Sequence, residues 1–120
     1  MNLRRQGGAY ERAAEAFLVA AGARVLERNY RRAGGEVDLI VRMGDATVFV
    51  EVKQRSDGRH GTPGEAVNAA KQARISRVAL AYLKENHLLD GRVRFDVVEI
   101  GPDGIRHIRS AFNYRETRAR

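Results

Sequence analysis

The stretch from Gly35 to Lys53, GEVDLIVRMGDATVFVEVK, constrains the fold most, because it predicts a β-hairpin with charged side chains at defined positions. Apolar and β-branched residues dominate the two runs on either side of its centre, as expected of paired strands. Gly44-Asp45 lies between these runs and predicts a two-residue turn, with glycine first as a type II′ turn prefers. With this turn, Met43 pairs with Ala46, and the register of the whole hairpin follows.

This register places Asp38 opposite Glu51 and Glu36 opposite Lys53. Directly opposed side chains lie on one sheet face with their Cβ atoms about 5 Å apart. Because side chains alternate along a strand, Glu51 and Lys53 share a face. Opposed carboxylates repel unless a cation lies between them, and Mg²⁺ takes such oxygen ligands while keeping several waters. With a lysine beside them, the two carboxylates suit metal-assisted hydrolysis of a phosphodiester.

The alternative interpretation of the hairpin is purely structural. Its polar face would be solvated, and Glu36 and Lys53 would form a surface ion pair. Spacing alone does not separate these two interpretations, because short motifs often match by chance.

Five segments together resemble the YraN-type family of bacterial proteins. They are LERNYR (26–31), GEVDLI (35–40), VFVEVKQR (48–55), GTPGEAV (61–67) and RFDVVEI (94–100). Asp38, a spacer and then Glu51-Val52-Lys53 resemble the D…ExK signature of the PD-(D/E)XK nuclease superfamily, to which that family is assigned, with a likeness to archaeal Holliday-junction resolvases. The resemblance implies a restriction-endonuclease-like α/β fold, in which a mixed central β-sheet is flanked by helices.

The resemblance also implies roles for individual residues. Asp38 and Glu51 would be catalytic ligands of Mg²⁺ or Mn²⁺, and Lys53 would orient or deprotonate the attacking water. Glu11 would be a helix-borne outer ligand or partner, although Tyr10 stands where the family usually has glycine before it. Helical geometry also favours Glu11 over Glu15, which lies further toward solvent.

Length and charge fit this interpretation. The 120 residues predict a single nuclease-like domain, 1–120, with a basic arm at 1–8 and a basic tail at 114–120. The net charge of +7 and the sequence pI near 10.5 indicate a polyanionic partner. We expect that partner to be nucleic acid, with DNA as the favoured candidate, rather than a membrane. The sequence has no cysteine, no long apolar run and no signal-peptide pattern, so we expect a cytoplasmic protein without disulfides.

Together with the hairpin, the rest of the sequence predicts helices and strands in the order αβββαββ. We expect helices at 9–21 and 62–86, the second begun by Thr62-Pro63-Gly64-Glu65 as a capping box. Besides the hairpin, we expect strands at 24–31, 92–100 and 105–111, the last at the sheet edge. The crossover through the second helix predicts that the third and fourth strands are parallel.

Several basic and polar residues are candidate nucleic-acid contacts. They are Gln54, Arg55, Lys71 and Arg74. Lys71 is notable because it falls on the buried stripe of the second predicted helix, where it either snorkels to solvent or reaches a phosphate. The function predicted from the sequence is a metal-dependent DNA endonuclease, with branched DNA and recombination or repair intermediates as candidate substrates and a homodimer as one candidate assembly. The alternative is a non-catalytic nucleic-acid-binding protein that keeps the nuclease fold.

Overall fold

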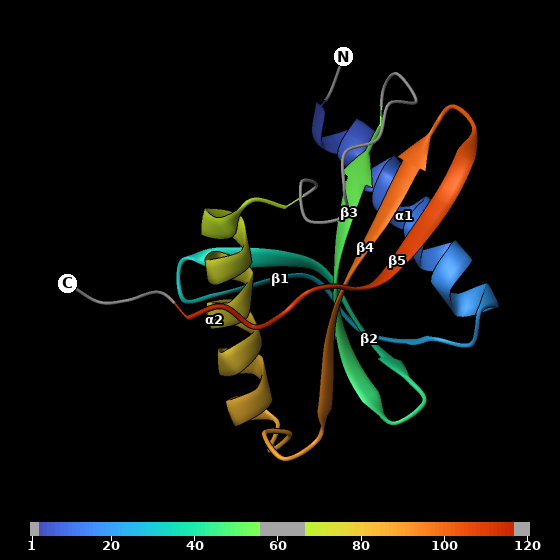
Figure 1. Cartoon of the computed structure of the whole chain (residues 1–120). Coiled ribbons are helices and arrows are strands. Elements are labelled where there is room, and N and C mark those ends of the chain that lie inside the picture. Colours follow the sequence, from blue (N-terminus) through green and yellow to red (C-terminus); the bar gives the residue numbers. More distant parts are fainter. Residues whose placement is uncertain (1–2, 56–66, 117–120) are drawn as a thin grey trace.

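The computed structural model describes residues 3–55 and 67–116, which form a five-stranded sheet and two helices (Figure 1). The order of elements is α1 (Leu3–Ala20), β1 (Arg24–Arg32), β2 (Gly35–Met43), β3 (Ala46–Gln54), α2 (Ala69–Glu85), β4 (Arg92–Gly101) and β5 (Gly104–Phe112). This order confirms the αβββαββ prediction and the mixed α/β class. Among the described residues, no helix is long and apolar enough to cross a membrane.

The strands lie side by side in the order β1-β2-β3-β4-β5. All neighbours are antiparallel except β3 and β4, which are parallel and are joined by the connection that contains α2. The expected parallel pair and the expected edge position of β5 are therefore both confirmed. A parallel pair needs a long crossover connection, which this chain provides through α2.

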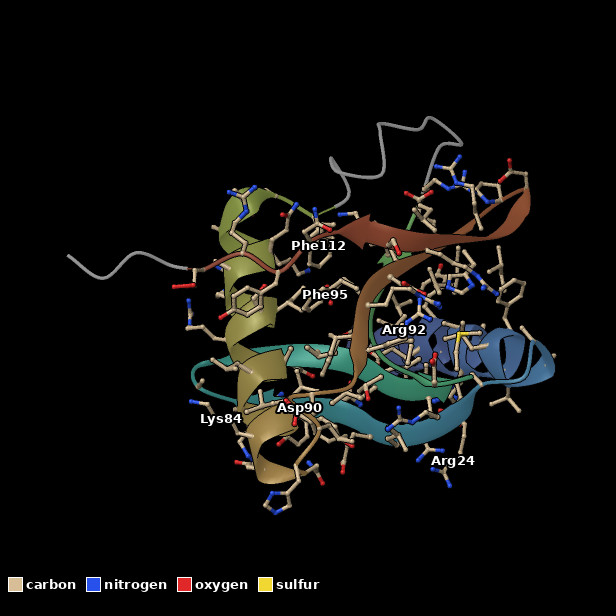
Figure 2. The ribbon with its side chains drawn as sticks, turned by 60° about the horizontal axis from the view of Figure 1, so that its bottom comes forward. Arg24, Lys84, Asp90, Arg92, Phe95 and Phe112 are labelled. Carbon is tan, nitrogen blue, oxygen red and sulfur yellow. The ribbon has the colours of Figure 1, made fainter. Side chains whose placement is uncertain are left out.

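The strand alternation of β3 divides the core into two clusters. Phe49 points toward α2 and packs with Val78 and Tyr82, whereas Val48 and Val50 belong to the cluster around Leu18 and Ala14 of α1. Each helix thus covers one face of the sheet with the buried stripe that its sequence predicts. On the α2 side, aromatic rings of β4 and β5 lie next to each other, since Phe95 and Phe112 stack at a centroid distance of 5.1 Å (Figure 2).

The central hairpin forms as predicted at its turn. Met43 pairs with Ala46, and Ile40 pairs with Phe49. Gly44 has a φ of 60°, which is the left-handed conformation that a type II′ turn demands of its first central residue.

Both helices begin at positions that differ from the prediction. Helix α1 begins at Leu3 rather than residue 9, so residues 3–8 continue the helix and do not form a separate arm. Helix α2 begins at Ala69, because the Asn68 side chain accepts a hydrogen bond from the Lys71 N–H at 2.9 Å and acts as the N-cap. A helix over 62–86 is therefore wrong at its start, and the predicted capping box at Thr62 lies outside the described residues.

A buried network of polar side chains joins the edge strand β5 to β4. The Asp96 side chain is fully buried and accepts two hydrogen bonds from Arg94 at 2.9 Å and one from the Ser110 N–H at 3.0 Å. The His107 Nε2 lies 2.7 Å from the same carboxylate. Burial alone would raise the pKa of Asp96, but the hydrogen bonds from these partners outweigh it and lower the pKa. The network ties β5 to β4 where their register shifts beside Asp96.

We expect the Asp96→Asn variant to be less stable than the wild type at pH 7 by about 3 kcal/mol, because removing one charge leaves its buried partners uncompensated. The pKa of Asp96 is lower in the folded than in the unfolded chain, where the ordinary value is 3.8. Its contribution is thus present above pH 3.8 and is lost as the pH falls through the folded value. Urea unfolding at pH 7 and pH 3 should show the difference shrinking in acid, whereas the exposed Asp90→Asn control should show little change at either pH. An unchanged stability at pH 7 would contradict the role assigned to Asp96.

Candidate functional site

The candidate site lies where β2 and β3 stop pairing. Their regular pairs end at Leu39 and Val50, and the next backbone donor, the Val52 N–H, donates to Asp38 Oδ2 at 2.8 Å. A carboxylate thus takes the place of a backbone acceptor at the point where the two strands separate. Figure 1 shows the consequence, because the β1–β2 hairpin turns away beneath α2 while β3 continues beside β4.

The separation changes part of the predicted register. Asp38 and Glu51 do not form a regular ladder pair, because the pairing ends one position before them. Glu36 pairs with Arg31 on β1, and the Arg31 Nε lies 3.3 Å from its carboxylate. The expected pairing of Glu36 with Lys53 is therefore wrong, because the start of β2 pairs with β1 and not with β3.

Asp38 and Glu51 are nevertheless electrostatic neighbours. The pKa of Asp38 is raised to about 7, first by burial and then by the negative charge of Glu51, while the Val52 N–H and the charge of Lys71 act in the opposite direction. The Glu51 side chain is 8% exposed, and its Oε2 forms an ion pair with the Lys71 ammonium from the first turn of α2. Two carboxylates of the separated strands and one ammonium of α2 therefore lie together at the site.

Helix α1 adds a third carboxylate from the other side. Burial and the charge of Asp38 raise the pKa of Glu11, whereas a hydrogen bond from the Asn29 side chain lowers it. Glu11 also has a side-chain hydrogen bond with Asp38 itself. A cavity of about 330 Å³ opens here, and its lining consists of Gly8, Glu11, Arg12, Glu15, Arg28, Asn29, Asp38 and Leu39. The structure thus brings the predicted Glu11 to Asp38.

Glu15 differs from Glu11 because it already has a cationic partner. Its two carboxylate oxygens accept hydrogen bonds from the Arg28 Nε and Nη2, each at 2.8 Å. This hydrogen bonding lowers the pKa of Glu15. Glu15 lines the same cavity as Glu11, but its charge is already paired with Arg28, so the preference for Glu11 as the site glutamate stays a prediction.

Asn29 is a site residue that the sequence analysis missed. It has a φ of 48°, a left-handed conformation that asparagine tolerates better than most residues. The pairs of Arg28 with Leu39 and of Tyr30 with Val37 place it opposite Asp38. The signal that could have found it is an asparagine in the middle of a strand, where β propensity does not favour it.

The remaining predicted residues lie in two different environments. Lys53 and Gln54 are exposed at the end of β3, and Arg74 is exposed on α2. The Arg55 side chain, by contrast, is 8% exposed, with its Nε 3.3 Å from Glu99 and its Nη2 3.1 Å from Asp103. Arg55 is therefore committed to ion pairs within the fold, and the structure does not present it to a nucleic acid.

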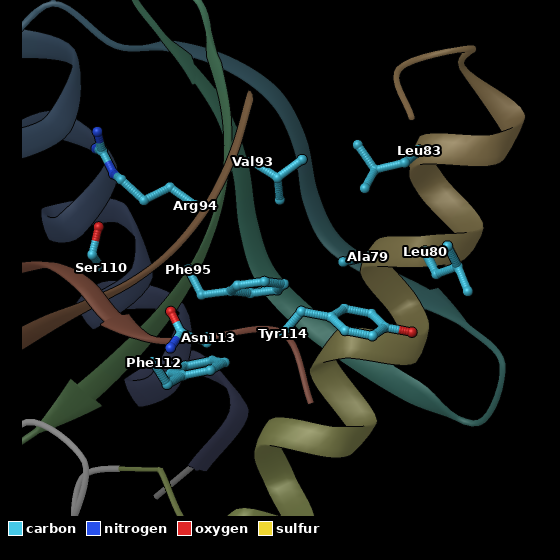
Figure 3. Close-up of a pocket in the computed structure, with 10 residues that line it drawn as sticks. All are labelled: Ala79, Leu80, Leu83, Val93, Arg94, Phe95, Ser110, Phe112, Asn113 and Tyr114. Carbon is cyan, nitrogen blue, oxygen red and sulfur yellow. The ribbon is translucent and has the colours of Figure 1, made fainter. Parts of the chain in front are cut away.

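A second cavity, of about 300 Å³, lies on the other side of the sheet edge between α2 and the chain after β5. Figure 3 shows the Phe95, Phe112 and Tyr114 rings along it, facing Ala79 and Leu83 of α2. Its lining contains no carboxylate and none of the predicted site residues. It is an apolar gap at the edge of the core and does not belong to the candidate site.

The oxygen donors at the site suit a hard divalent cation. Within residues 3–55 and 67–116, no group of three or more His, Cys, Asp or Glu side chains is arranged to hold a metal ion. Mg²⁺, however, is usually held by one or two carboxylates and several waters. Asp38 and Glu51 provide two such carboxylates, and their mutual repulsion is relieved by added positive charge.

Comparison with known proteins places this chain among bacterial relatives. The model of the uncharacterised protein family UPF0102 matches residues 10–100. A UPF0102 protein of Symbiobacterium thermophilum is 51% identical over 115 residues, which cover 92% of this chain and 98% of that protein. One from Clostridioides difficile is 41% identical over 114 residues, which cover 93% of this chain and 100% of that protein.

Among solved structures, SfsA of Pyrococcus furiosus in complex with Ca²⁺ is similar at a TM-score of 0.36 and 16% identity. The match covers 90% of this chain and 62% of that one. A likeness this weak supports no conclusion about fold or activity.

The raised pKa of Asp38 makes the stability of the metal-free protein depend on pH. The pKa is about 7 in the folded chain and has an ordinary value of 3.8 in the unfolded chain. The contribution of Asp38 to stability is therefore fully present below pH 3.8 and is lost as the pH rises through about 7. We expect Asp38→Asn, which cannot ionise, to gain at least about 1.4 kcal/mol on the wild type between pH 4 and pH 8, the equivalent of one pKa unit.

Urea unfolding in the presence of a chelator measures this gain. Asp45→Asn is the matched control, because Asp45 lies in the exposed hairpin turn with its side chain 74% exposed. Parallel pH profiles for the wild type and Asp38→Asn would contradict the buried, repelled state assigned to Asp38.

Proposed function

We propose that this chain, which belongs to the UPF0102 family, is a divalent-metal-dependent endonuclease that hydrolyses DNA phosphodiester bonds, with branched or repair intermediates as candidate substrates. The observation that supports the proposal is the electrostatic repulsion between the neighbouring carboxylates of Asp38 and Glu51 where β2 and β3 separate. The restriction-endonuclease-like PD-(D/E)XK signature that the sequence resembles assigns metal binding to these same two residues. Buried carboxylates that repel each other cost stability, and such a cost is typical of functional sites.

Each side chain of the site has a distinct task in this proposal. Asp38 and Glu51 would hold Mg²⁺ or Mn²⁺, which supplies Lewis-acid polarisation of the phosphate. Lys53 lies on the same strand face as Glu51, with its ammonium exposed to solvent, where it orients the attacking water and stabilises negative charge on the phosphate. Glu11 accepts from Asn29 and restrains the Asp38 carboxylate from the side of α1.

The DNA backbone would lie against the exposed polar residues around this site. The net charge of +7 attracts a polyanion, and Lys53, Gln54 and Arg74 are exposed on neighbouring elements. The turn before β2 packs closely on α2, because a Cβ at Gly35 would lie 3.3 Å from the Arg74 carbonyl oxygen. This contact places the start of β2 directly beside the backbone of Arg74 on α2. A homodimer would provide two such surfaces for cleavage of two strands.

One observation favours a second candidate, a non-catalytic nucleic-acid-binding protein. Lys71 already neutralises Glu51, so the site is charge-balanced in part without a metal. The two functions differ in cleavage and not in binding: both proteins keep their affinity for DNA when the carboxylates are neutralised, but a binding protein shows no metal-dependent cleavage even as the wild type.

We expect Asp38→Asn or Glu51→Gln to abolish cleavage while DNA binding persists or improves, because each change removes a metal ligand and also removes repulsion against phosphate. A panel of linear, nicked and branched DNA with Mg²⁺ or Mn²⁺ measures cleavage, and a gel-shift assay measures binding. Asp45→Asn, in the exposed hairpin turn, is the control and should cleave as the wild type does. Wild-type cleavage by either site variant would show that the metal ligands are assigned incorrectly.

We expect Glu11→Gln to lower metal-dependent cleavage by at least about tenfold, which is about 1.4 kcal/mol of transition-state stabilisation. Glu11 contacts Asp38, whereas Glu15 is occupied by Arg28, so Glu15→Gln should behave as a surface substitution. Single-turnover rates at saturating metal measure both variants. The reverse ranking would place Glu15 at the site, and equal, small effects would show that α1 takes no part in the reaction.

A further inference from the structure

Lys71 reaches the candidate site from α2, a helix whose buried face packs in the core. It lies in the first turn of α2, where the Asn68 side chain fixes its backbone N–H at 2.9 Å. Its side chain is 40% exposed, whereas the Glu51 side chain that it contacts is 8% exposed. The helix cap thus fixes the backbone of Lys71, while its long side chain remains partly exposed to solvent.

The Glu51 carboxylate needs a positive partner because it is buried. An unpaired buried carboxylate costs several kcal/mol, and the cations on β3 and directly after it are paired elsewhere or exposed to solvent. Arg55 contacts Glu99 and Asp103, and Lys53 is exposed. Lys71 therefore supplies the positive charge at Glu51, and the same charge opposes the rise in the pKa of Asp38.

We infer that Lys71 is an internal counterion that a divalent cation displaces from Glu51. This inference rests on the proposed function, because it takes Glu51 as a metal ligand. An ammonium and a divalent cation repel each other, so both cannot contact one buried carboxylate at full strength. On displacement, the Lys71 ammonium turns to the solvent side of α2, toward exposed Arg74, where it binds a phosphate of the nucleic acid.

The displacement couples two binding events. A metal that releases Lys71 adds one phosphate contact, so it raises the affinity for DNA, and DNA that holds the released lysine raises the affinity for the metal by the same factor. The protein would bind DNA without metal more weakly than its net charge alone predicts. A free lysine at this position would give no such coupling.

Lysine labelling tests the displacement itself, because the sequence contains just three lysines, Lys53, Lys71 and Lys84. The full-length protein is acylated with an amine-reactive ester, with Mg²⁺ or with a chelator, and the product at each lysine is measured by mass spectrometry. We expect Mg²⁺ to increase the acylation rate of Lys71 by about threefold or more, because an ammonium held on a buried carboxylate is less available to the reagent. Lys84, exposed in the last turn of the same helix, should not change.

Calorimetric titration with Mn²⁺ alone gives the second readout. We expect Lys71→Met to bind Mn²⁺ at least about fivefold more tightly than the wild type, because no ion pair has to be broken. Lys84→Met should match the wild type, and Glu51→Gln should lose the binding.

The two measurements separate the inference from the proposed function. Mn²⁺ binding that is absent from both the wild type and Lys71→Met would overturn the proposed metal site and the inference together. Metal binding with unchanged acylation of Lys71 would overturn the inference alone, even if Lys71→Met binds more tightly, because a distant effect of charge would then explain the affinity. Wild-type affinity in Lys71→Met would overturn it as well.

Discussion

The site depends on one hydrogen bond, which joins the Val52 N–H to the Asp38 carboxylate where the β2–β3 ladder ends. A regular ladder would place a backbone carbonyl there and keep the strands together. With a side chain as acceptor, β2 leaves β3 and follows β1, and the space between them is reached from both faces of the sheet. Glu11 of α1 enters from one face, and Lys71 of α2 contacts Glu51 from the other. The two helices pack in separate core clusters, but each contributes one charged side chain to this site.

The contrast between two aspartates shows why this arrangement indicates function. Asp96 is fully buried, yet Arg94, His107 and the Ser110 N–H compensate its charge, so its pKa is lowered. Asp38 has one backbone donor and a carboxylate as its neighbour, so its pKa is raised to about 7. Both residues are charged groups within the fold, but the fold compensates Asp96 fully and Asp38 only in part. An uncompensated carboxylate is a candidate cation ligand, whereas a compensated one fixes the structure.

The sequence predicted those features that depend on local pattern. The turn at Gly44, the element order, the parallel β3–β4 pair and the buried stripe of α2 all follow from alternation, helical periodicity and turn residues. The start of α2 did not, because Thr62-Pro63 is a stronger N-terminal signal than Asn68. The left-handed Asn29 and the contact of Lys71 with Glu51 depend on how distant segments pack, which no local pattern records.

Arg55 follows the D…ExK motif in the sequence and fixes the position of the motif without being part of the candidate site. Its backbone N–H donates to the Ile100 carbonyl at 2.8 Å, and its guanidinium lies against Gly101, where a Cβ would come within 2.8 Å of Cζ. Glycine at 101 is therefore what allows the guanidinium to reach Glu99 and Asp103. These contacts fix the end of β3 to the β4–β5 turn, two residues beyond Lys53. The backbone of Lys53 is thereby held in place while its side chain stays exposed, which is what positioning a lysine toward an external phosphate requires.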